Sequence, residues 1–145
     1  MSHRPVHEII QNRQFLTSTP EKSVHAVAAH MRDNQDGAVL VVSPDGKLRG
    51  IVTERDLAFK VLAAGLDATG TTVGEVMTTG PQTIAPEKPF AHALHMMYEG
   101  GFRHLPVVLP DGRPIGVVSA RDALGLEMLD FRQELDKREE LTVIL

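Results

Sequence analysis

The residue types best suited to chemistry occur twice in the chain, in the same order. Residues 50–56 read Gly-Ile-Val-Thr-Glu-Arg-Asp, and residues 116–122 read Gly-Val-Val-Ser-Ala-Arg-Asp. A hydroxyl at a helix N-terminus, beside free N–H groups and the positive end of the helix dipole, favours an anion. A carboxylate one turn later can accept two hydroxyl hydrogen bonds, as a ribose would offer, and the arginine can supply charge for a phosphate. The two motifs therefore predict a pair of nucleotide-type sites.

The same spacing also has a purely structural interpretation. Thr53 and Ser119 can each cap a helix, while Asp56 and Asp122, three residues on, bond back to the N–H of the cap residue. This arrangement is the capping box, and it needs no ligand. Because one carboxylate can serve both a cap and a ligand, the two interpretations do not exclude each other.

The motifs belong to an internal repeat with an offset of 66 residues. Residues 20–56 align without a gap onto residues 86–122, and 13 of the 37 aligned residues are identical. Chance would give only two or three identities. A repeat of this kind indicates one structural unit made twice.

Each copy predicts the order β-α-β-β-α. Helical spacing links Val24, Val27, Ala28 and Met31 in one copy, and Phe90, Ala93, Leu94 and Met97 in the other. The expected strands are residues 16–18, 38–42 and 48–52, and then 82–84, 105–109 and 115–118. A Pro-Asp-Gly turn separates the last two strands of each copy. We also expect a polar linker at 65–72, a one-turn helix at 73–77, a charged helix at 130–140 and an apolar tail at 141–145.

The repeated unit resembles a pair of cystathionine-β-synthase (CBS) domains, often called a Bateman module. The matching residues are both Gly-to-Asp motifs, Val-Gly-Glu-Val-Met-Thr at 73–78 and Arg-His-Leu-Pro-Val-Val at 103–108. The resemblance implies an α+β fold in which two β-α-β-β-α repeats pack sheet to sheet with pseudo-twofold symmetry. It places the repeats at 8–66 and 79–130, a linker and short helix at 67–78, and a C-terminal helical extension and tail at 131–145.

The resemblance also implies clefts that bind an adenosine-containing ligand, namely AMP, ADP, ATP or S-adenosylmethionine, as a regulatory adenine nucleotide and not as a required cofactor. Thr53 and Asp56 would serve one cleft, and Ser119 and Asp122 the other. The full set of implied nucleotide-binding residues is Thr17, Val39, Thr53, Arg55, Asp56, Thr83, Ala85, Arg103, His104, Leu105, Pro106, Ser119, Arg121 and Asp122.

The two copies differ where a phosphate would be held. The second copy has Arg103 and His104 where the first has Gly37 and Ala38. We therefore expect the cleft that contains Arg103, His104, Ser119 and Arg121 to be the better phosphate site. In the first copy, only Arg55 and Lys60 would supply positive charge.

Composition excludes several classes of protein. The chain has 145 residues, a net charge of −4, no cysteine, no tryptophan, one tyrosine and five phenylalanines. The acidity and the few aromatic side chains argue against nucleic acid as a partner. No apolar stretch reaches the roughly 20 residues that a membrane span needs, and the first residues lack the apolar core of a signal peptide. We therefore expect a cytoplasmic protein with no membrane partner.

Catalysis has little support in the sequence. There is no cysteine nucleophile, no Gly-x-Ser-x-Gly elbow, no Gly-rich phosphate loop ending in Lys-Ser/Thr and no His-Glu-x-x-His zinc motif. We therefore predict that the chain is not an enzyme. The alternative hypothesis to a nucleotide sensor is a scaffold or dimerisation module that binds no ligand.

Two helix faces bear on metals and partners. His92, His95 and Glu99 share a face, but without a further ligand they predict a solvated or subunit-contacting surface and no metal site. The equivalent face of the first copy holds Ala26, Ala29 and Asp33, whose small residues would allow close helix approach, so we interpret it either as a homodimer contact or as an ordinary exposed alanine face. The resemblance to CBS pairs, which often dimerise through these helices, favours a homodimer. The apolar tail also requires a partner surface, and a sensor of this kind implies a protein target that the sequence does not identify.

Overall fold

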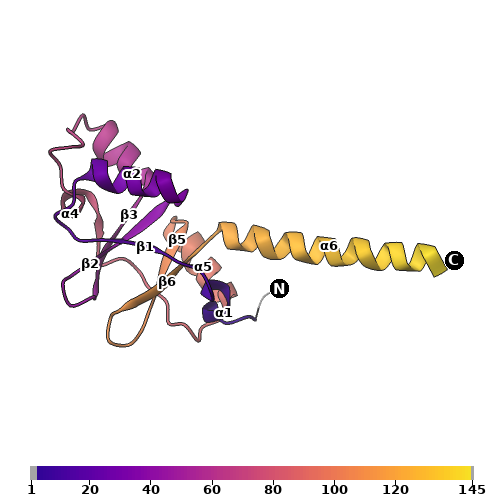
Figure 1. Ribbon diagram of the computed structural model, residues 1–145. Coiled ribbons are helices and arrows are strands. Elements are labelled where there is room, and N and C mark those ends of the chain that lie inside the picture. The colour runs from indigo at the N-terminus through magenta and orange to yellow at the C-terminus, as the bar shows by residue number, and fades with distance from the viewer. Residues whose placement is uncertain (1–2, 145) are drawn as a thin grey trace.

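The computed structural model describes residues 3–144, which form an α+β fold with two sheets (Figure 1). The larger sheet has the order β1-β2-β3-β4, and the smaller pairs β5 with β6. The strands are β1 (Leu16–Ser18), β2 (Ala38–Val42), β3 (Leu48–Thr53), β4 (Thr78–Thr79), β5 (His104–Val108) and β6 (Pro114–Ser119). The helices are α1 (Val6–Ile10), α2 (Val24–Asn34), α3 (Glu54–Asp56), η1 (Leu57–Leu62, a π-helix), α4 (Val73–Val76), α5 (Phe90–Gly100) and α6 (Arg121–Ile144).

Strand pairing repeats at the offset of 66 residues. Ala38 pairs with Thr53 in the first copy, and His104 pairs with Ser119 in the second. Both antiparallel pairs shift register at equivalent places, after Val41 and after Val107. The gapless alignment of the sequence is therefore confirmed in three dimensions.

The extended segment that opens each copy is less regular in the second. In the first copy it forms β1, which pairs parallel to β2 over three residues. The equivalent segment at 82–84 makes a single parallel bridge, between Ile84 and Val107. The strand expected at 82–84 is therefore reduced to one bridge at the position equivalent to Ser18.

The two long helices of the repeats form for local reasons. The side chain of Ser23 caps α2 by accepting a hydrogen bond from the N–H of Ala26. Gly101 caps the C-terminus of α5 in the left-handed conformation, with a φ of 71°. Each helix buries one apolar stripe against its own sheet: Val24, Val27 and Met31 in α2, and Phe90, Ala93 and Met97 in α5.

The two repeats exchange short segments. Helix α1 precedes the first repeat but packs on the second, where Val6 and Ile10 join the core that contains Phe90 and Leu105. Helix α4 precedes the second repeat but packs on the first, where Val73 joins the core of α2 and β2. Strand β4 then adds to the edge of β3. Each repeat is thus completed by a segment that lies in front of the other repeat in the sequence.

The sheets contact each other in a third apolar cluster. Leu40 and Ile51 of the larger sheet pack with Val117 of the smaller one. A backbone hydrogen bond of 3.0 Å from the N–H of Leu48 to the carbonyl of Gly112 also joins the two copies. The predicted packing of sheet on sheet is confirmed.

Helix α6 extends far from the body of the molecule (Figure 1). It runs without a break from Arg121 to Ile144, through the segments expected as a charged helix and an apolar tail. The side chains of residues 141–145 lie outside the described part of the chain. Within that part, no helix is both long enough and apolar enough for a membrane span.

Candidate functional site

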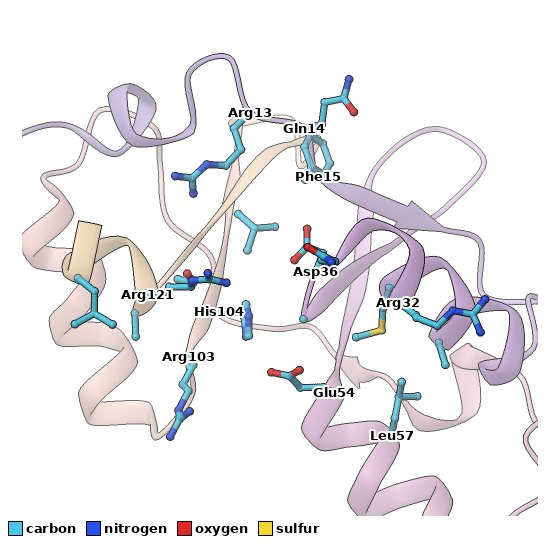
Figure 2. A pocket seen from close by; sticks show the side chains of 18 residues that line it. Arg13, Gln14, Phe15, Arg32, Asp36, Glu54, Leu57, Arg103, His104 and Arg121 are labelled. Carbon is cyan, nitrogen blue, oxygen red and sulfur yellow. The ribbon is translucent and has the colours of Figure 1, made fainter. Parts of the chain in front are cut away.

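A cleft of about 820 Å³ separates the two copies, and we call it the Ser119 cleft (Figure 2). The second copy contributes Arg103, His104, Ser119 and Arg121 to its wall. The first copy faces them with residues that include Gly37, Asp36, Glu54 and Leu57, and the segment that leads into β1 adds Arg13, Gln14 and Phe15. Four predicted site residues are therefore brought together here.

A second cleft, of about 810 Å³, lies around the motif of the first copy, and we call it the Thr53 cleft. Its lining from the first copy includes Thr53, Arg55 and Asp56. Its wall also includes Glu54 and Phe59 of the first copy, and further along the chain Gly80, Pro81, Gln82, Gly101, Phe102, Arg103 and His104. Arg103 and His104 thus line both clefts, and each cleft is built from residues of both copies.

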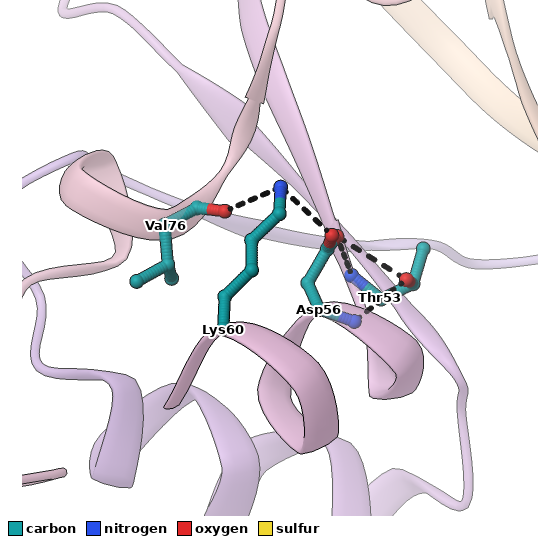
Figure 3. Close-up of polar contacts among 4 residues, drawn as sticks. All are labelled: Thr53, Asp56, Lys60 and Val76. Atoms are coloured by element: carbon teal, nitrogen blue, oxygen red, sulfur yellow. Dashed lines mark hydrogen bonds and ion pairs between the residues drawn. The ribbon is translucent and has the colours of Figure 1, made fainter. Parts of the chain in front are cut away.

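The first motif forms a complete capping box (Figure 3). The N–H of Thr53 donates to Asp56 Oδ2 at 2.9 Å, and the N–H of Asp56 donates to Thr53 Oγ1 at 3.4 Å. Lys60, one turn further on, holds Asp56 Oδ1 at 3.0 Å and donates to the carbonyl of Val76 at 3.1 Å. Lys60 does not line the Thr53 cleft, so of the two cations expected for the first copy only Arg55 does.

The second motif is held differently. The N–H of Ser119 donates to Asp122 Oδ2 at 2.8 Å, which is half of a capping box. The other carboxylate oxygen accepts from Arg13 Nη1, also at 2.8 Å, across 109 residues of sequence. Asp122 itself is absent from the lining of the Ser119 cleft.

The Ser119 cleft carries more positive than negative side chains. Its cations come from both copies: Arg13, Arg32, Arg103 and Arg121, with His104 at the centre. Asp36 and Glu54 lie opposite. Burial lowers the pKa of His104, an effect that the nearby carboxylates of Glu54, Asp36 and Asp122 oppose and Arg103 reinforces. Arg103, which stands at the position of Gly37 in the first copy, therefore adds positive charge to the cleft in which a phosphate is expected.

The remaining predicted site residues line neither cleft. Val39, Leu105 and Pro106 are fully buried in the strands, and Thr17 is exposed on β1. Thr83 and Ala85 are partly buried on either side of Ile84. The structure therefore brings none of these six residues into the lining of either cleft.

Sequence reasoning missed several lining residues, of which Arg13 and Phe102 are the clearest. Arg13 lies ahead of the aligned repeat and has no counterpart that could have pointed to it. Phe102 follows the left-handed Gly101, a helix stop that is visible in the sequence but says nothing of the cleft beyond it.

The candidate metal face does not gather ligands. His92, His95 and Glu99 are all exposed on α5, and His95 Nε2 lies 3.9 Å from Glu99 Oε1. Across the described residues, no group of three or more histidine or acidic side chains could hold a metal ion.

Two duplicated α+β units that exchange segments and enclose paired clefts define a tandem-repeat module with clefts lined by both copies. The model of one family, the CBS domain, matches residues 6–63 and again residues 73–128. The chain belongs to the CBS domain family and contains two such domains, as the resemblance in the sequence predicts.

Known proteins of this family are similar over most of the chain. The CBS domain-containing protein CBSCBSPB1 of Arabidopsis thaliana is 37% identical over 110 residues, or 76% of this chain, which spans only 20% of that relative. A putative signal-transduction protein with CBS domains from Burkholderia ambifaria has a TM-score of 0.80 at 31% identity, covering 88% of this chain and 96% of that one. The CBS domain pair of protein MJ0100, solved in complex with 5′-methylthioadenosine and S-adenosyl-L-methionine, has a TM-score of 0.77 at 27% identity, covering 85% and 98%.

Proposed function

We propose that the chain is a regulatory module that binds adenosine-containing ligands in the two clefts and performs no catalysis itself. The observation that carries this proposal is the Thr53 cleft. There a hydroxyl, an arginine and an acid of one copy face the Arg103–His104 pair of the other across a space of about 810 Å³. Small-molecule sites commonly have volumes of about 300–1,000 Å³.

The side chains of the Thr53 cleft match the parts of a nucleotide. Asp56 lines the cleft and can accept hydrogen bonds from ribose hydroxyls, while Arg55 and Arg103 can pair with a phosphate. Phe102 and Pro81 offer apolar surface to a base. The adenosine compounds bound to the related CBS pair of MJ0100 support this class of ligand.

A signal would follow from the position of the clefts. Because both copies contribute to each wall, a ligand that contacts both favours one relative arrangement of the repeats. The change would pass to a protein target by surface contact. A homodimer through the outer face of α2, where Ala26 is exposed and Ala29 half-buried, is the second part of this proposal.

One observation favours the alternative, a scaffold that binds no ligand. Both motif acids already have internal partners: Asp56 has Thr53 and Lys60, and Asp122 has Ser119 and Arg13. A ligand must therefore displace or share these bonds, whereas a scaffold needs no change.

Thermal unfolding in the presence of adenosine, 5′-methylthioadenosine, AMP, ATP and S-adenosylmethionine separates the two functions. A ligand at 100 times its dissociation constant adds about 2.7 kcal/mol, which raises the melting temperature by several degrees. Asp56→Ala should lower the melting temperature without ligand and reduce the ligand-dependent rise.

The chain offers a matched control for the lost cap. Thr72 and Glu75 form a second capping box, with 2.7 Å from the N–H of Thr72 to Glu75 Oε2, and neither residue lines a cleft. Glu75→Ala should therefore lower the basal melting temperature and leave the ligand-dependent rise intact. If none of the five compounds stabilises the unmodified chain, the scaffold function is correct.

A further inference from the structure

Asp56 and Asp122, the acids of the two motifs, differ in their position relative to the clefts. Their side chains are almost equally buried, 13% exposed for Asp56 and 12% for Asp122, but Asp56 lines the Thr53 cleft whereas Asp122 does not line the Ser119 cleft. The group that lines the Ser119 cleft in its place is Arg13, whose Nη1 lies 2.8 Å from Asp122 Oδ1. The equivalent acids of a duplicated motif thus line the cleft in one copy and lie behind an arginine in the other.

The position of Arg13 follows from the exchange of segments. Helix α1 is anchored on the second copy by the buried side chains of Val6 and Ile10, and its last turn leads to Arg13. The arginine is therefore held beside the motif of the second copy even though it precedes the first. Its side chain remains 44% exposed, so it has room to turn within the cleft.

The cation that holds Asp56 is arranged in another way. Lys60 belongs to the same helical segment as Asp56 and is tied to the carbonyl of Val76, away from the Thr53 cleft. A ligand that enters the Thr53 cleft therefore meets the carboxylate and not its cation. In the Ser119 cleft the ligand meets the cation first.

This difference sets a chemical condition on the ligand. Asp122 Oδ2 already accepts the N–H of Ser119, so a ribose must compete with Arg13 for the remaining oxygen. A nucleoside without phosphate offers the displaced guanidinium no new partner. A phosphate offers it two oxygens in the geometry that arginine prefers, and charge-assisted bonds of this kind are the strong ones.

We infer that Arg13 makes the Ser119 cleft selective for phosphorylated adenosine ligands, because a phosphate draws the guanidinium away from Asp122 and uncovers the ribose acceptor. The inference rests on the proposed function, since it specifies the ligand class of one of the same clefts. It makes the Ser119 cleft the phosphate-dependent site and leaves the Thr53 cleft open to nucleosides as well.

Titrations with AMP and with adenosine, followed by ¹H–¹⁵N NMR spectra of the full chain, test each cleft separately. The amide of Ala120 reports on the Ser119 cleft, and the amide of Gly101 reports on the Thr53 cleft. In the unmodified chain, AMP should shift both signals, whereas adenosine at the same concentration should shift only Gly101. Arg13→Gln should tighten adenosine binding at Ala120 by about tenfold and weaken AMP binding there, because one charge-assisted bond is worth about that factor.

Arg113→Gln is the matched control, since Arg113 also pairs with an acid, Asp111 at 2.7 Å, and lines neither cleft. It should leave both titrations unchanged. Arg13→Met, which keeps the aliphatic stem, should repeat the effect of Arg13→Gln and guards against a local packing defect. If adenosine binds at Ala120 no better in either Arg13 variant, the selectivity is overturned while the proposed function stands. If neither ligand shifts either signal in the unmodified chain, both are overturned.

Discussion

His104 is one of the residues that the two clefts share, with Arg103 and Glu54. It lines both of them, and Gly37 of the other copy lies against it, since a Cβ at Gly37 would be 3.4 Å from His104 Nε2 and 3.0 Å from Glu54 Oε1. His104 stands where the first copy has Ala38. The absence of a side chain at Gly37 leaves room for the imidazole. Burial at this junction lowers the pKa of His104 in spite of three nearby carboxylates, those of Glu54, Asp36 and Asp122.

This lowered pKa predicts a loss of stability on mild acidification. The unfolded chain has the ordinary histidine pKa of 6.5, so it binds more protons than the folded chain between that value and the lower folded one. The free energy of unfolding should fall as the pH drops through 6.5 and stop falling on this account below the folded pKa. Chemical denaturation between about pH 7.5 and pH 5.5 measures the slope.

His104→Gln should flatten that slope, because it removes the titrating group from the junction. His95→Gln serves as the control, since His95 is exposed on α5. Equal slopes in the unmodified chain and in His104→Gln would contradict the prediction.

At this scale, the sequence predicts the groups that occur twice and misses those that occur once. Thr53, Asp56, Ser119 and Asp122 were found because the same motif stands at the same offset. The partner of Asp122 is Arg13, which lies 109 residues earlier in the sequence. No periodicity or repeat indicates that the fold brings these two residues together. The contact of Arg13 with Asp122 and its place in the Ser119 cleft could therefore be found only from the structure.

At the scale of elements, the glycine that opens each Gly-to-Asp motif, Gly50 or Gly116, makes the exchange of segments possible. A Cβ at Gly50 would lie 2.5 Å from Met77 Sδ and 2.8 Å from the carbonyl oxygen of Thr78, directly after α4. A Cβ at Gly116 would lie 2.7 Å from Ile10 Cδ1 in α1. The two glycines are equivalent in the repeat. The absence of a side chain at each one leaves room for the segment that precedes the other repeat, residues 77–78 beside Gly50 and α1 beside Gly116.

We predict that Gly50→Ala and Gly116→Ala both destabilise the fold, by about 1–3 kcal/mol for overpacking of this kind. Gly50→Ala should be the more harmful, because the backbone of Thr78 cannot turn aside as the Ile10 side chain can. Urea denaturation gives both free energies of unfolding.

Gly125→Ala provides a control of opposite sign, since Gly125 lies within α6 and a Cβ there meets nothing within 4 Å. It should stabilise the helix by up to about 1 kcal/mol. A smaller effect of Gly50→Ala than of Gly116→Ala would contradict the close approach described for β3 and β4.

The elements with a clear period were predicted well, whereas of the short ones β1 and α4 were predicted and α1 and β4 were not. The spacing of Val24, Val27 and Met31 identifies α2, and that of Phe90, Ala93 and Met97 identifies α5. Helix α1 has only five residues, too few to show a helical period, and it was not predicted. The one-turn helix α4 was predicted, but its packing on the first repeat was not, because packing partners at long range leave no local signal.

At the scale of the whole molecule, the two copies are interdependent through the exchanged segments. Ile10→Ala should cost about 2–5 kcal/mol, the usual range for removing a buried isoleucine side chain. Although Ile10 precedes the first repeat, the loss should appear in the second, whose core it completes. Hydrogen exchange of amides in β5 and β6 measures this effect.

Val24→Ala is the complementary variant, since Val24 belongs to the core of the first repeat. If protection in β5 and β6 were unchanged by Ile10→Ala, α1 would be only a loosely attached end. Because the sheets share the cluster around Leu40 and Val117, we expect the two repeats to unfold together, so both variants should also lower the melting temperature of the chain.

The exchange of segments also orders the events of synthesis on the ribosome. The first repeat can complete its core once residues 73–79 have emerged, but α1, although it precedes both repeats, has no docking surface until β6 ends at Ser119. At about 5–20 residues per second, the 109 residues between Ile10 and Ser119 take roughly 5–20 seconds. A five-residue helix is not stable alone, so the side chains of Val6 and Ile10 stay exposed to solvent until the second repeat has formed. The nascent chain thus exposes the apolar side chains of Val6 and Ile10 while the core that will bury them is still being translated, and during that interval they are open to contact with another chain.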